Sequence, residues 1–154
     1  MNASLHIVIL AAGKGTRMYS KLPKVLHQIG GLPLVQHVIN TAQSLEPASI
    51  QVVIGHGKEQ VQAQIQSDVT WVVQDQQLGT GHAVKCSLPN LPKDGKTLIL
   101  YGDVPLTDAE TLQQLLLQAG NEVGLLTDVL DNPQGYGRII RNEQGICAIV
   151  EEKD

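Results

Sequence analysis

The sequence predicts a single α/β domain with a mostly parallel mixed sheet and helices on both faces of it. Short apolar runs alternate four times, over residues 5–119, with segments in which apolar residues recur at helical spacing. This alternation is typical of βαβ units, in which a helix joins two parallel strands. After Gly120 the helical spacing stops, and turn residues separate β-rich segments. That change predicts an antiparallel extension of the sheet in the C-terminal third.

Local patterns place each element in turn. The parallel strands are expected over Leu5–Leu10, Ile50–Gly55, Thr70–Gln74 and Thr97–Gly102. The helices are expected over residues 34–45, Lys58–Gln66, Leu78–Leu88 and 109–119. The antiparallel strands are expected over residues 122–130, 137–141 and 146–152. Pro33 favours the start of the first helix, and Asp108 has a side chain suited to cap the last one.

The composition bounds the class of protein. A chain of 154 residues with a formal net charge of −4 fits one globular domain and argues against a general nucleic-acid binder. The longest apolar run, Ile7–Ala12, is too short to span a bilayer, and the N-terminus lacks the basic region of a signal peptide. Cys86 and Cys147 show no metal-binding spacing, so reduced thiols are expected. We therefore expect a cytoplasmic protein that binds neither membranes nor nucleic acid.

Three glycine-rich polar clusters follow expected strands. They are LAAGKGTR after the first strand, QDQQLGTGH after the third and YGDVPL after the fourth. Ligands of open α/β sheets bind at the carboxyl ends of the strands, so these loops are expected to form one site. The first loop matches neither the G-x-G-x-x-G fingerprint, where Met18 replaces the third glycine, nor the P-loop. Its small residues, with Lys14 and Arg17, still indicate an anion.

The chemistry that fits these loops is phosphoryl or nucleotidyl transfer. Lys14, Arg17 and Lys24 are candidates to hold a triphosphate, and Asp103 to hold Mg²⁺, which commonly uses one or two carboxylates together with substrate phosphates. A second substrate with its own phosphate would attack the α-phosphorus and expel pyrophosphate. Simpler readings remain open: Asp103 as a turn cap, the Gly79–His82 segment as a plain helix start, and the Gly135–Arg138 segment as a plain turn.

The motifs LAAGKGTRM, SKLPKVL, QLGTGHA, LYGDVPL, GYGRI and IVEEKD, in this order, carry a family resemblance from Leu5 to the last residue. The sequence resembles the N-terminal uridyltransferase domain of the bacterial bifunctional N-acetylglucosamine-1-phosphate uridyltransferase / glucosamine-1-phosphate acetyltransferase. The resemblance implies a Rossmann-like nucleotide-diphospho-sugar transferase fold. It also implies a UDP-N-acetylglucosamine pyrophosphorylase, which joins UTP and N-acetylglucosamine 1-phosphate into UDP-N-acetylglucosamine and pyrophosphate with Mg²⁺, for cell-wall precursor synthesis.

The resemblance also implies residue roles. Arg17 and Lys24 would be the catalytic cations on the phosphates, and Asp103 would hold the metal. The uridine side would be lined by Leu10, Ala11, Ala12 and Gly13. The uracil would be recognised by Gln74, Gly79 and Thr80. Tyr101 and Gly102 would lie beside the sugar nucleotide, and Gly137 and Glu151 would contact the N-acetylglucosamine part.

The chain departs from the family pattern after its last residue. The family domain continues through an Asn-Thr-Gly stretch that contacts the sugar and a later Asn that completes the metal site. A β-helix that carries the acetyltransferase and builds a homotrimer follows in that family. Residues 1–154 are therefore expected to be the N-terminal part of one nucleotidyltransferase domain, with little or no activity alone. The alternatives are another sugar-phosphate or cytidylyl nucleotidyltransferase, and a non-catalytic nucleotide-sugar binding module.

Overall fold

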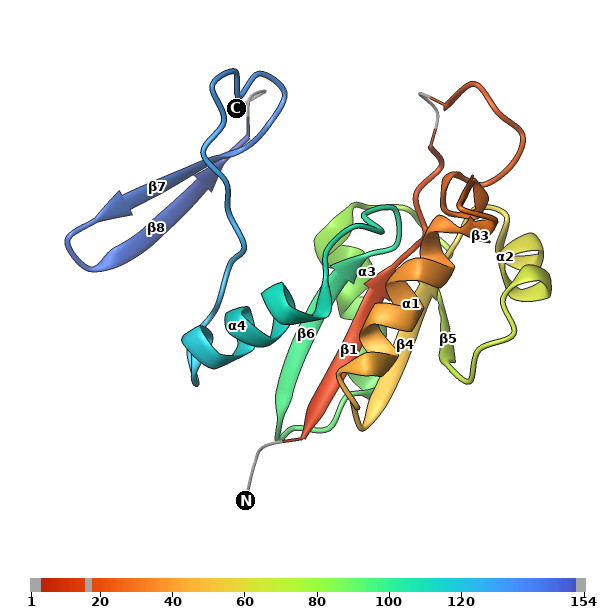
Figure 1. The fold of residues 1–154 in the computed structure, drawn as a ribbon, viewed down its shortest axis with the longest axis horizontal. Coiled ribbons are helices and arrows are strands. Elements are labelled where there is room, and N and C mark those ends of the chain that lie inside the picture. Colours follow the sequence, from red (N-terminus) through yellow and green to blue (C-terminus); the bar gives the residue numbers. More distant parts are fainter. Residues whose placement is uncertain (1–3, 16–17, 152–154) are drawn as a thin grey trace. The chain divides into compact units, whose positions relative to one another are not determined.

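A parallel four-stranded sheet forms the centre of the larger of two compact units. The computed structural model describes residues 4–15 and 18–151, and the chain divides into units 1–124 and 125–154. The strands are β1 (Leu5–Leu10), β4 (Ser49–Ile54), β5 (Thr70–Val73) and β6 (Lys96–Tyr101) (Figure 1). They run parallel in the order β5-β4-β1-β6. The four strands predicted from apolar runs are thus confirmed within a residue at each end.

Four helices connect or follow these strands. They are α1 (Leu34–Ser44), α2 (Lys58–Gln64), α3 (Thr80–Ser87) and α4 (Ala109–Ala119). Each lies within its predicted range. Asp108 caps α4 as expected, because its Oδ1 accepts a hydrogen bond of 2.7 Å from the backbone N–H of Thr111.

Alternate residues of the central strands bury two separate faces. Ile7 and Ile9 of β1 pack in one core with residues of α1, α2 and α4, while Val8 and Leu10 pack in another with Ala83 of α3. Helices therefore cover both faces of the sheet, as the pattern predicted. Burial on both faces explains why β1 and β4 are mostly apolar at neighbouring positions, with His6 and Gln51 as buried polar exceptions.

The strand order fixes where a ligand site is expected. From β1 the chain adds β4 and then β5 on one side of it, and then crosses back to add β6 on the other side. The reversal places the end of β1 between the loops that follow β5 and β6. In open α/β sheets, ligands bind outside the carboxyl ends of the strands near such a reversal.

Short elements that the sequence did not predict lie between β1 and α1. A 3-10 turn, η2 (Lys24–Leu26), precedes a small hairpin of β2 (Gln28–Ile29) and β3 (Leu32–Pro33). A second 3-10 turn, η3 (Leu88–Asn90), follows α3. The buried side chains of Val25 and Leu26 join the core beneath α1, and this packing anchors η2 and the lysine at its start.

The C-terminal unit contains one antiparallel hairpin. Strands β7 (Arg138–Asn142) and β8 (Gly145–Val150) pair in a two-stranded sheet of their own, with a register shift between Ile140 and Arg141. The prediction of a strand over residues 122–130 was wrong, because this segment is irregular. Its alternating apolar residues fit a strand, but a strand also needs a partner to receive its backbone hydrogen bonds. Within the described part of this unit, only β7 and β8 pair.

Two further expectations concern helices and thiols. Among the described residues, the structure has no helix with both the length and the apolar character required to cross a membrane. Cys86 is half-buried, Cys147 is exposed, and both are free thiols in the structure.

Candidate functional site

A cavity of about 280 Å³ lies at the carboxyl ends of β1 and β6. It is lined by Leu10, Ala11, Ala12, Gly13, Lys24, Val25, Gln74, Gln77, Gly79, Thr80, Ala83, Tyr101 and Asp103. All of these except Val25, Gln77 and Ala83 are site residues that the sequence predicted. The three loops expected to converge therefore do converge on one cavity.

Backbone hydrogen bonds hold the end of β1 between its neighbours. Leu10 O accepts a bond of 2.9 Å from Gly102 N, and Ala11 N donates a bond of 2.8 Å to Val53 O. Gly102, predicted to lie beside the sugar nucleotide, is not among the residues that line the cavity. Gly102 directly follows β6, and its hydrogen bond to the end of β1 fixes the positions of the neighbouring Tyr101 and Asp103.

The glycine loop approaches Lys24 closely. Gly15 has a φ of +60°, and a Cβ atom there would lie 2.6 Å from the Cβ atom of Lys24. Glycine therefore meets both a conformational and a steric requirement at this position. The contact brings the first loop against η2, so that Lys24 reaches the cavity beside the loop.

Lys24 and Asp103 form an ion pair inside the cavity. Lys24 Nζ lies 2.5 Å from Asp103 Oδ2, and the two side chains remain 35% and 28% exposed. Within residues 4–15 and 18–151, this is the one ion pair between side chains. The pairing brings together the expected phosphate cation and the expected metal ligand, which are far apart in the sequence.

Gln74 presents a fixed amide to the cavity. It is 4% exposed, and its Nε2 lies 3.2 Å from Gly79 O and 3.0 Å from His82 Nδ1. A carbonyl oxygen only accepts hydrogen bonds, so the atom facing Gly79 O must be the amino group. The amide orientation assigned on this ground leaves Gln74 Oε1 to accept a hydrogen bond from a ligand.

Gln77 is a cavity residue that the sequence analysis missed. Its Nε2 donates a hydrogen bond of 2.8 Å to Ala12 O and so connects the loop after β5 to the loop after β1. Its position inside the QDQQLGTGH cluster was the available signal, but nothing in the sequence indicated a bond to a backbone carbonyl so distant along the chain. Val25 and Ala83 were missed because their apolar side chains resemble core residues.

The residues that could hold a metal ion are few. Among the described residues, no group of three or more His, Cys, Asp or Glu side chains is arranged to hold a metal ion. Asp103 supplies one carboxylate at the cavity wall. This donor set fits Mg²⁺ bound together with substrate phosphates, which provide the remaining oxygen ligands, and it does not fit a separate protein cage.

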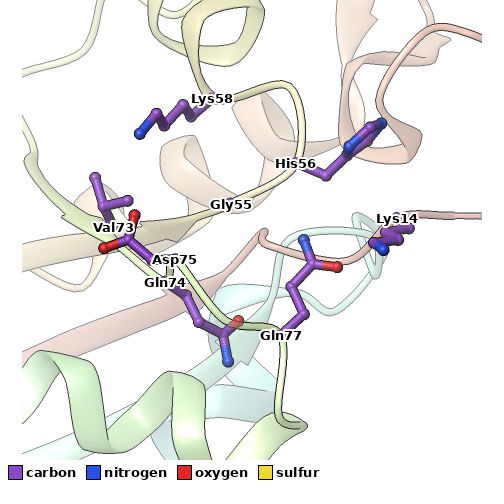
Figure 2. A pocket seen from close by; sticks show the side chains of 8 residues that line it. All are labelled: Lys14, Gly55, His56, Lys58, Val73, Gln74, Asp75 and Gln77. Carbon is purple, nitrogen blue, oxygen red and sulfur yellow. The ribbon is translucent and has the colours of Figure 1, made fainter.

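A second, more open cavity of about 290 Å³ lies beside the first and shares Gln74 and Gln77 with it. It is lined by Lys14, Gly55, His56, Lys58, Val73, Gln74, Asp75 and Gln77. Figure 2 shows Lys14 and His56 at one end of this cavity and Lys58 with Asp75 at the other. Lys14, suggested above as a phosphate cation, therefore lines a different cavity from Lys24.

Three further predicted site residues are not among the described residues that line these two cavities. Arg17 is outside the described residues. Gly137 and Glu151 belong to the C-terminal unit, where a Cβ atom on Gly137 would lie 3.5 Å from Glu151 Oε1. The structure thus brings these two residues together within their own unit.

The fold and the cavity define a nucleotidyltransferase class. The chain belongs to the MobA-like NTP transferase domain family, whose model matches residues 7–132. It is 67% identical over 152 residues to the bifunctional protein GlmU of Neisseria meningitidis serogroup B, and 61% identical over 153 residues to that of Chromobacterium violaceum. These matches cover 98% of this chain but 33% and 34% of the two relatives. The chain therefore spans about a third of their length, and the resemblance predicted from the motifs is confirmed.

Solved structures with low sequence identity share the fold. A putative glucose-1-phosphate thymidylyltransferase from Bacillus anthracis matches with a TM-score of 0.78 and 20% identity, over 98% of this chain and 66% of that one. A Mycobacterium tuberculosis protein, crystallised in complex with manganese, matches with a TM-score of 0.64 and 16% identity, over 99% and 73%. At these identities the likeness confirms the nucleotidyltransferase fold alone.

Proposed function

We propose that this chain binds UTP in the cavity at the end of β1 and carries the uridyltransferase reaction, which makes UDP-N-acetylglucosamine from UTP and N-acetylglucosamine 1-phosphate. The observation that carries the proposal is the convergence of the three strand-end loops on one cavity that contains both the Gln74 amide and the Lys24–Asp103 pair. The high identity to the GlmU proteins supports the same reaction.

The choice of base rests on Gln74. Its free carbonyl oxygen accepts a hydrogen bond, and uracil carries a donor at N3. Cytosine has a lone pair at N3, so two acceptors would face each other there. This contrast disfavours the cytidylyl alternative. Thymine shares the N3–H of uracil, so Gln74 by itself does not separate UTP from dTTP.

The phosphate chemistry rests on charge and position. A phosphate oxygen of the sugar phosphate forms a bond to the α-phosphorus of UTP, while the bond from that phosphorus to the bridging oxygen breaks and pyrophosphate leaves with the electron pair. Lys24 would leave Asp103 and contact the phosphates, where its ammonium group offsets their charge. Mg²⁺ on Asp103 would stabilise the charge that develops on the phosphate oxygens.

Other parts of the proposal extend the resemblance. Arg17 would assist Lys24, backbone N–H groups of the 10–13 loop would contact the nucleotide, and Gly137 and Glu151 would contact the sugar. Trimer formation would belong to the β-helix of the longer relatives. These assignments remain predictions.

The test is a calorimetric titration of the chain against UTP, CTP, dTTP and GTP with Mg²⁺ present, followed by a pyrophosphate-release assay with N-acetylglucosamine 1-phosphate or glucose 1-phosphate. We expect selective binding of UTP. Product formed from N-acetylglucosamine 1-phosphate would establish the reaction. A preference for CTP or dTTP would contradict the substrate. Tight UTP binding without turnover, also in a chain extended by the corresponding segment of the GlmU relatives, would favour a non-catalytic nucleotide-sugar binding module.

A further inference from the structure

His82 is a polar residue of α3 without a role in the proposed reaction. It is the third residue of this helix and is half-buried, and its Nδ1 atom lies 3.0 Å from the amino group of Gln74. We propose that His82 is a positioning residue that sets the base selectivity of the cavity by holding the Gln74 amide in one orientation. This inference rests on the proposed function, because it concerns how the same cavity chooses its base.

The hydrogen-bond geometry determines the state of the histidine. Gly79 O accepts a hydrogen bond of 3.1 Å from Ala83 N. Because a carbonyl oxygen only accepts, the Gln74 atom that faces it must be the amino group. The amino group therefore also faces His82, so Nδ1 must accept. An imidazole that accepts at Nδ1 carries its proton on Nε2. The two amide protons of Gln74 are thus both engaged, one by Gly79 O and one by His82.

This arrangement leaves one orientation of Gln74 favourable. If the amide rotated by half a turn, Oε1 would face Gly79 O, which only accepts, and Nε2 would face the cavity. His82 would then lose its bond to the amide unless its proton moved from Nε2 to Nδ1. A donor that faces the cavity opposes the N3–H of uracil and suits the N3 lone pair of cytosine. The bond to Gly79 O is long, at 3.2 Å, so the bond to His82 supplies the second restraint against rotation.

Gly79 makes the geometry possible. It has a φ of +97° at the start of α3, and a Cβ atom there would meet no atom within 4 Å. Its conformation turns the 79 carbonyl so that it receives both the first helical hydrogen bond and the Gln74 amino group. The GTGH segment is therefore more than a helix start: it supplies two acceptors, three residues apart, to one amide.

A purely structural role for His82 predicts a different result. If His82 served only the packing of α3, its loss would lower the stability of the chain or weaken the binding of every nucleotide equally. A role in orienting Gln74 predicts a change in the ratio of UTP to CTP affinity, and little change in the affinity for pyrophosphate, which contains no base.

The test compares H82A, H82N and the control H37A by calorimetry with UTP, CTP and pyrophosphate. His37 is a suitable control because its Nε2 bonds to Ile29 O in the β2–β3 hairpin, and it does not line the cavity. We expect H82A to reduce the UTP to CTP affinity ratio by about three- to tenfold, the worth of one hydrogen bond. We expect H82N to retain the ratio, because Asn Oδ1 replaces the Nδ1 acceptor, and H37A to leave it unchanged.

The outcomes separate this inference from the proposed function. If the unaltered chain selects UTP and H82A keeps the full ratio, the inference is wrong and the proposed function stands. If the unaltered chain does not prefer UTP to CTP, both the inference about His82 and the proposed function are wrong. A measurement that needs no variant is the ¹⁵N NMR spectrum of the His82 ring. A protonated Nδ1 would overturn the inference, and a protonated Nε2 with a free Nδ1 would support it.

Discussion

Lys24 Nζ lies 2.5 Å from Asp103 Oδ2, so each of these two charged groups satisfies the other. The Asp103 side chain is 28% exposed, and a carboxylate withdrawn this far from water needs a partner, because removing it from water is costly. The pair also means that a ligand must compete for both groups. A metal ion competes with Lys24 for the carboxylate, and phosphate oxygens compete with Asp103 for the ammonium group.

Lys24→Ala is expected to weaken the binding of UTP by about tenfold or more, because a charge-assisted hydrogen bond to phosphate contributes about 1.5–3 kcal/mol. Binding of uridine, which lacks phosphates, is expected to change little. Calorimetric titration of both ligands measures the difference, and the difference is expected to shrink in high salt. Equal UTP affinity in the variant and the unaltered chain would remove Lys24 from the phosphate site.

Gly15→Ala is expected to lower both stability and UTP affinity. Alanine at a φ of +60° costs about 1–2 kcal/mol, and its Cβ atom would lie 2.6 Å from Lys24 Cβ, so the loop or η2 must shift. Thermal unfolding and UTP titration measure the two effects. Gly81→Ala is the matched control, because a Cβ atom on Gly81 in α3 meets nothing within 4 Å. A Gly15→Ala variant as stable as the Gly81→Ala variant would contradict the packing described above.

The sequence predicted the sheet and its helices well because burial dominates their patterns. The strands β1 and β4 are covered on both faces, so their apolar runs stand out, and α1 has a clear apolar stripe beside a proline start. The strand expected over residues 122–130 shows the limit. Its pattern alternates as a strand should, yet a pattern does not supply a pairing partner.

The candidate site could be predicted as a set of residues, but its contacts could not. Glycine-rich clusters after strands indicate converging loops, since all parallel strands end at the same edge. The pairing of Lys24 with Asp103, and the bond from Gln77 to Ala12 O, depend on side-chain directions across distant segments. The orientation of Gln74 depends in turn on the backbone of Gly79, which no local pattern revealed.

Asp108 gives the stability of α4 a pH dependence. The hydrogen bond from the backbone N–H of Thr111 holds the pKa of the Asp108 carboxyl below its ordinary value. A pKa that is lower in the folded state adds stability above the unfolded-state pKa, and this contribution is lost as the pH falls through the folded-state pKa. D108N keeps a capping oxygen and removes the charge, so its thermal midpoint is expected to fall less steeply in acid than that of the unaltered chain. D108A is expected to lower the midpoint at neutral pH as well. Parallel acid profiles for D108N and the unaltered chain would contradict this role.

Divalent cations are expected to bind this chain weakly alone and more tightly with UTP. Asp103 supplies a single carboxylate to the cavity, and Lys24 already holds it in the ion pair. The phosphates of UTP both draw Lys24 away and add oxygen ligands, so the two ligands assist each other's binding. Electron paramagnetic resonance of free Mn²⁺, with and without UTP, measures this coupling.

Lys24→Ala is expected to tighten Mn²⁺ binding in the absence of UTP, because the competing cation is gone. Asp103→Asn is expected to abolish the coupling while leaving the fold intact. Equal Mn²⁺ binding by the Asp103→Asn variant and the unaltered chain would place the metal elsewhere.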